Sequence, residues 1–125
     1  IADVTNLSFP VVSGNKYWFR FVIPYTSAAT TTGSRWTING PSTTMLNYTS
    51  TYTLTATSNT VNSATAYDIP AASNATSLTA GNVAIIEGII QPSTNGTVIA
   101  RFASEISGSA IVAKAGAVCY YQQIA

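Results

Sequence analysis

The sequence contains no histidine, only one cysteine and very little charge. Without histidine, the chain has no Ser-His-Asp triad, no Cys-His pair and no histidine-ligated metal site of its own. The lone Cys119 has no partner for an internal disulfide, which excludes a small fold held together by disulfide bridges. Because no histidine is present to activate its thiol, we expect Cys119 to be a small core residue and not a nucleophile.

Charged side chains are scarce and nearly balanced. Five basic and four acidic residues make up 7% of the 125 residues, against about 25% in an average domain. A net charge of +1 argues against nucleic-acid binding, which needs several Lys and Arg to neutralise phosphates. The longest apolar stretch, Val83–Ile90, contains Glu87 and is far shorter than the roughly 20 residues that cross a bilayer. We therefore expect no nucleic acid, no membrane, no metal and no cofactor among the partners.

Apolar and polar residues alternate with a period of two along most of the chain, which is typical of β-strands with one buried face. The pattern is clear in residues 15–25, where Tyr17, Phe19 and Phe21 share one face, and in residues 45–57, where threonines line the other face. No window has an apolar stripe at helical spacing. The predicted strands cover residues 15–25, 34–39, 45–57, 64–69, 83–91, 97–106, 110–114 and 118–124.

About eight strands with turn signals between them predict an all-β protein, an antiparallel β-sandwich. We favour a jelly roll over an immunoglobulin-like sandwich, because the chain lacks the paired cysteines of antibody domains. The length fits one domain. Residues 1–125 are therefore expected to form a single sandwich, with residues 1–14 as an N-terminal arm or a first strand.

Two segments between the predicted strands carry loop signals. Residues 71–82 are rich in Ala, Ser, Asn and Thr and are expected to form a loop. Residues 92–96 end in Asn-Gly, which readily takes the positive φ of a tight turn. We expect this turn to join residues 83–91 and 97–106 as a β-hairpin.

Glu87 is the most conspicuous charged residue, because it lies within the apolar run Ala84–Ile90. A buried carboxylate must be paired or protonated. We expect a buried ion pair between Glu87 and Arg101, with Arg20 or Arg35 as alternative partners and a subunit contact as a further one. A role as catalytic acid is disfavoured, because glycoside hydrolysis needs two facing carboxylates and the chain has only four in all. We expect no enzymatic activity.

Tyrosine and tryptophan are the remaining candidates for recognition. Seven Tyr and two Trp on a nearly uncharged chain suit stacking on sugar rings or the filling of protein interfaces. Four of these residues lie on mixed strand faces or near a chain end. The residues expected at a subunit or ligand interface are Trp18, Trp36, Tyr120 and Tyr121.

Several segments share a pattern of strands and structural glycines. They are residues 15–25 (NKYWFRFVIPY), residues 32–41 (TGSRWTINGP), residues 86–90 (IEGII) with 95–97 (NGT), and residues 112–117 (VAKAGA). Together they resemble small structural proteins of tailed bacteriophages, over nearly the whole chain. Such domains look like jelly-roll sandwiches that assemble as homotrimers, and the family has no catalytic residue to carry over.

The resemblance implies a virion protein with one of two roles. The first is a capsid decoration protein that binds the phage major capsid protein on the outer head surface. The alternative is the tip of a tail fibre, which would recognise a host surface glycan. We favour decoration, because the chain is short and no fibrous segment precedes the predicted domain. The apolar strands and the low charge agree with either role, since both leave apolar area to bury against other subunits.

Overall fold

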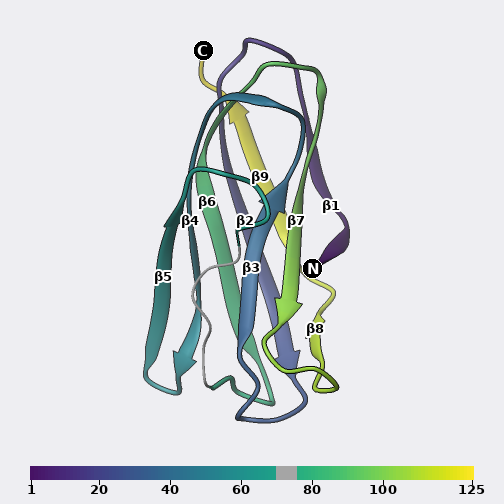
Figure 1. Cartoon of the computed structure of the whole chain (residues 1–125), viewed down its shortest axis with the longest axis vertical. Helices are drawn as coiled ribbons and strands as arrows, with labels where there is room; N and C mark the ends of the chain where they lie inside the picture. Colours follow the sequence, from purple (N-terminus) through teal and green to yellow (C-terminus); the bar gives the residue numbers. More distant parts are fainter. Residues whose placement is uncertain (70–75) are drawn as a thin grey trace.

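The computed structural model of the chain describes residues 1–69 and 76–125. Two antiparallel β-sheets pack face to face as a sandwich, with β3 and β7 lying over the larger sheet (Figure 1). The described residues contain no helix, so the all-β prediction is confirmed. The strands of these residues are β1 (Ala2–Val11), β2 (Tyr17–Ser27), β3 (Ser34–Asn39), β4 (Thr43–Thr55), β5 (Ser58–Ala64), β6 (Asn82–Pro92), β7 (Gly96–Ser104), β8 (Ile111–Ala113) and β9 (Val118–Gln123).

The strand order is that of a jelly roll. β1 pairs with β7, β2 with β6 and β4 with β5, so the pairs are nested around the β4–β5 hairpin. The smaller sheet has the order β1-β7-β3, and the larger sheet has β5-β4-β6-β2. β8 and β9 both lie along the other edge of β2, β9 beside its first half and β8 beside its end. A long antiparallel hairpin that rolls up gives this nested order, and the prediction of a jelly-roll sandwich is confirmed, with nine strands in the described residues where about eight were predicted.

The core lies between the two sheets and is built from alternate residues of the facing strands. In β2, Tyr17 is 5% exposed, and Phe19, Phe21 and Ile23 are fully buried. Phe9 of the smaller sheet covers this row, with its ring centroid 5.7 Å from that of Phe19 and 5.9 Å from that of Phe21. Successive side chains of a strand point to opposite faces, so the predicted apolar face of this strand is the core face.

The turn at residues 92–96 joins the two sheets and does not form a hairpin. β6 pairs with β2 and β4, whereas β7 pairs with β1 and β3, so the prediction of a β-hairpin is wrong. Other loops hold the turn: Gly14 N donates to Pro92 O (2.9 Å), and Ser93 N donates to Ser42 O (2.8 Å). The same turn residues suit a hairpin and an arch between sheets, so the sequence alone does not separate the two.

The strand predicted at residues 64–69 is also wrong, because β5 ends at Ala64 and the following residues turn back toward β3. Asp68 N donates to a backbone carbonyl of β3 at 3.1 Å, which brings this segment alongside the smaller sheet. The first part of the predicted loop 71–82 lies outside the described residues. The described part of that loop forms no strand until β6 begins.

Candidate interaction surfaces

Over β2, β6 and β9 the larger sheet turns a mostly apolar face away from the core, whereas β4 carries Asn47, Thr49 and Thr51 on the same side. We call this surface the outer face. Of its exposed side chains, Ile89 is 37% exposed and Tyr120 is 55% exposed. Large apolar areas that are turned away from the core commonly mark interaction surfaces. In β2, β6 and β9 the outer face consists of Trp18, Arg20, Val22, Pro24, Val83, Ile85, Glu87, Ile89, Val118, Tyr120 and Gln122.

Three of the four aromatic residues predicted at an interface have accessible surface. Trp18 is half-buried on the outer face, and Tyr120 lies on the same face of β9, opposite Arg20. Tyr121 follows Tyr120 and therefore points to the opposite side of the sheet. There it stacks on Phe9 of the smaller sheet, with ring centroids 4.9 Å apart, and closes one edge of the sandwich while staying 48% exposed.

Trp36 is a core residue, so its prediction as an interface residue is wrong. Its side chain is fully buried, stacked on Phe102 at a centroid distance of 5.2 Å and packed against Tyr25 at 4.8 Å. The indole Nε1 donates to Ser34 Oγ (2.9 Å), which satisfies its only polar group. The alternation of Trp36 with Arg35 predicts a strand. It does not show which face of that strand the opposite sheet covers.

The predicted ion pair between Glu87 and Arg101 is wrong as well. Arg101 Nη1 lies 2.6 Å from Asp68 Oδ1, and its Nε lies 2.9 Å from Asp3 Oδ1. Glu87 is half-buried, and its Oε2 accepts a hydrogen bond from Trp18 Nε1 (3.1 Å). Both residues point away from the core, but from different sheets, so they lie on opposite sides of the sandwich.

Neither of the two alternative partners, Arg35 and Arg20, forms an ion pair with Glu87. Arg35 forms a two-pronged ion pair with Glu105, in which Nη2 donates to Oε2 at 3.0 Å. Arg20 stands directly opposite Glu87 in the register of β2 and β6. Among the described residues, however, the ion pairs involve neither Arg20 nor Glu87.

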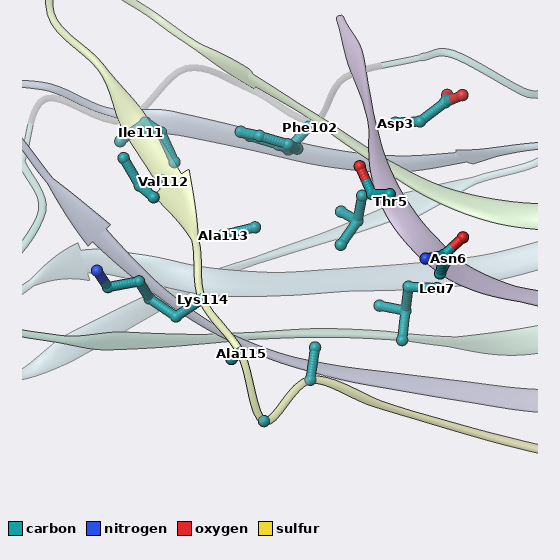
Figure 2. Close-up of a pocket in the computed structure, with 13 residues that line it drawn as sticks. Asp3, Thr5, Asn6, Leu7, Phe102, Ile111, Val112, Ala113, Lys114 and Ala115 are labelled. Carbon is teal, nitrogen blue, oxygen red and sulfur yellow. The ribbon is translucent and has the colours of Figure 1, made fainter.

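A groove lies along the open edge of the sandwich, between β1 of the smaller sheet and β8 of the larger one. Its volume is about 510 Å³. Figure 2 shows Thr5 and Leu7 on the β1 side, Ile111 and Ala113 on the β8 side, and Phe102 behind them. The groove is therefore lined mainly by apolar side chains from both sheets.

A bulge in β1 shapes one wall of the groove. The pairing register of β1 and β7 shifts between Asp3 and Ser8, and Asn6 adopts a φ of 63°. A bulge of this kind changes where neighbouring side chains point. The Asp3 carboxylate already pairs with Arg101, and Figure 2 shows the amine end of Lys114 extending away from β1. The sequence pattern gave no signal for this groove, because it arises where the edges of two sheets meet.

Cys119 packs against the core, as the sequence predicts. It lies opposite Phe21 in the pairing of β9 with β2. Burial raises the pKa of its thiol to about 11. A thiol with this pKa is almost entirely protonated at neutral pH, so it is a poor nucleophile and a poor metal ligand.

Alkaline pH is expected to destabilise the protein. Burial holds the pKa of Cys119 at about 11, against 9.0 ordinarily, and that of Tyr67 at about 12, against 10.0. Both groups keep their protons more firmly in the folded state, so their contribution to stability is complete below pH 9 and is lost as the pH rises from about 9 to about 12. Urea unfolding at neutral pH and near pH 11 measures the effect. Cys119→Ala should lose less stability between the two conditions than the unmodified protein, and an equal loss would contradict the prediction.

Neither a metal centre nor a membrane helix is seen in residues 1–69 and 76–125. No three His, Cys, Asp or Glu side chains in these ranges are grouped so that they could hold a metal ion. The same ranges contain no helix that is long and apolar enough to cross a bilayer.

Comparison of the chain with protein-family models, with curated proteins and with solved structures found no match in any of the three. The class of protein is therefore defined by the fold itself: an antiparallel jelly-roll β-sandwich. Its two distinctive surfaces are the outer face of the larger sheet and the groove at the open edge.

Proposed function

We propose that the protein is a non-enzymatic structural protein of a tailed-bacteriophage virion, which binds the outer surface of the capsid as a homotrimer and stabilises it. The observation that carries this proposal is the exposed apolar surface: Val83 is 51% exposed, Val118 40% and Tyr120 55%. In the proposed homotrimer this surface is buried between copies, and other surfaces of the trimer contact the capsid. We name the phage capsid as the partner because the strand and glycine segments resemble those of phage structural proteins.

The state of the acidic residues supports a binding role over a catalytic one. Asp3 and Asp68 both pair with Arg101, and the Glu105 carboxylate pairs with an arginine of β3. Glu87 accepts a hydrogen bond from an indole. General acid–base catalysis needs a carboxyl group that is free to exchange a proton with a substrate. In this chain each carboxylate is engaged in a structural contact, which favours a protein that acts by packing.

A decoration protein stabilises a capsid through many repeated contacts. Each copy bridges neighbouring capsid subunits, and the modest contacts add because all copies act on one shell. We expect the purified protein to sediment with expanded capsids that lack it and to raise the temperature at which these capsids disrupt. Absence of binding at saturating protein, or an unchanged disruption temperature, would overturn the proposal.

The groove between β1 and β8 favours a second candidate function, the recognition of a host surface glycan by a tail-fibre tip. Its volume of about 510 Å³ lies within the roughly 300–1,000 Å³ typical of small-molecule sites. Leu7 and Phe102 offer apolar contact to a sugar ring, and Thr5 and Asn6 offer a hydroxyl and an amide for its hydroxyl groups. Adsorption of the isolated protein to bacterial cells, abolished by Thr5→Val but not by Thr97→Val on the far side of β7, would favour this role. Binding to capsids without adsorption to cells would exclude it.

A further inference from the structure

The outer face of the larger sheet is arranged in layers across its strands. The antiparallel register sets Trp18 opposite Ile89, and Val22 opposite Ile85. These two pairs form two apolar layers that cross from β2 to β6. On β9, Val118 extends the second layer, because it stands opposite Val22. The outer face thus resembles the inner surface of a packed interface, where apolar side chains lie at regular spacing.

One charged layer lies between these two apolar layers. Its charged members are Arg20 on β2 and Glu87 on β6, which are direct cross-strand neighbours, and Tyr120 of β9 and Thr49 of β4 flank them on the same face. Arg20 Nε is buried and has no hydrogen-bond partner among the described residues. The Glu87 carboxylate accepts from Trp18 through Oε2. Arg20 and Glu87 form no ion pair with each other or with another described residue, so both charges of this layer are available to a partner copy.

The charges of this layer are complementary to the charges of the same layer on another copy. The face carries one cation and one anion at the same height, on adjacent strands, so its net charge is zero. When identical faces turn toward a common rotation axis, Arg20 of one copy approaches Glu87 of the next, and the relation repeats around the ring. The apolar layers on either side then stack on their equivalents and exclude water from the charge pair. A strongly acidic or basic partner would leave one of the two charges unpaired, at a cost in free energy.

We propose that copies of this chain associate through the outer face of the larger sheet, with Arg20 of each copy paired to Glu87 of its neighbour. The inference rests on the proposed structural role and names the surface by which the oligomer closes. It assigns the apolar side chains of β2, β6 and β9 to the interface between copies, and it leaves the smaller sheet and the groove free for other partners.

Charge reversal at this layer tests the proposal. Arg20→Glu and Glu87→Arg each place two like charges opposite each other at the interface between copies. Each variant is therefore expected to be a folded monomer with a molar mass of 13.0 kDa. The double variant Arg20→Glu with Glu87→Arg restores opposite charges and is expected to regain the molar mass of the unmodified oligomer. Thr97→Glu, which introduces a charge at an exposed position of the smaller sheet, is the control and should keep the oligomer.

The readout is molar mass by light scattering, with circular dichroism to verify that each variant has kept its β-structure. A monomeric unmodified protein, single variants that stay oligomeric, or a folded double variant that stays monomeric would each overturn the proposed interface. If a single variant unfolds, the double variant still decides, because restored pairing must restore the oligomer. Failure to bind capsids with the oligomer intact would instead contradict the proposed function and leave this interface standing.

Discussion

Replacing Trp36 by alanine is expected to lower the free energy of unfolding by about 3–5 kcal/mol, the usual range for removal of a buried large aromatic side chain. The indole is fully buried between the rings of Tyr25 and Phe102, so its removal leaves a cavity at the centre of the sandwich. It also removes the hydrogen bond to Ser34 Oγ. Domains of this kind have only about 5–15 kcal/mol of stability in total. We therefore expect a melting temperature lower by roughly 10–20 °C.

Trp18→Ala is the matched control, because it removes the other tryptophan from the outer face. Trp18 is half-buried, and its ring lies outside the core. Its removal should cost the folded chain much less and should weaken the association of copies instead. Urea unfolding of both variants at one protein concentration measures the difference. Equal losses of stability, or a loss below about 1 kcal/mol for Trp36→Ala, would contradict the placement of Trp36 in the core.

Gly88→Ala is expected to destabilise the larger sheet by about 3 kcal/mol or more, at the upper end of the cost of overpacking. A Cβ at this position would lie 2.2 Å from Asn47 O and 2.5 Å from Tyr48 Cβ. The nearest atom belongs to the backbone of β4, which no change of rotamer can move away. Because β6 lies between β4 and β2, strain here disturbs the centre of the six-stranded sheet.

Gly81→Ala provides the control for this substitution. Nothing lies within 4 Å of a Cβ built at Gly81, and its φ lies outside the left-handed region. The change should alter stability by no more than about 0.5 kcal/mol. Thermal unfolding followed by circular dichroism distinguishes the two variants. A Gly88→Ala protein that melts at the same temperature as Gly81→Ala would contradict the described packing of β4 on β6.

The strand pattern was predictable because burial of one face imposes a local rule on every second residue. Tyr17, Phe19 and Phe21 obey this rule and are core residues, as expected. β5 escaped prediction because its residues are mostly Ser, Thr and Asn, and its one large apolar side chain, Val61, is 64% exposed. A strand at the edge of a sheet with little buried area has no apolar face to reveal it.

The errors arose where the outcome depends on which sheet a strand joins. The turn at residues 92–96 carries the same signal for a hairpin and for an arch, and pairing across the whole chain decided between them. That choice also separated Glu87 from Arg101, because β6 and β7 belong to different sheets. Trp36 was misplaced for a related reason: only the opposing sheet shows which face of β3 is covered. Trp18 and Tyr120 have accessible surface, as the predicted interface role requires, because both point outward, away from the core residues of their strands.

The molar mass of the unmodified protein in solution tests the central claim most directly, namely that this chain is a building block whose apolar outer face is covered by other copies. Light scattering across a range of protein concentrations is the measurement. We predict a homotrimer, with three times the 13.0 kDa of the single chain. A mass of 13.0 kDa at every concentration would contradict the account, because the outer face would then stay exposed to water.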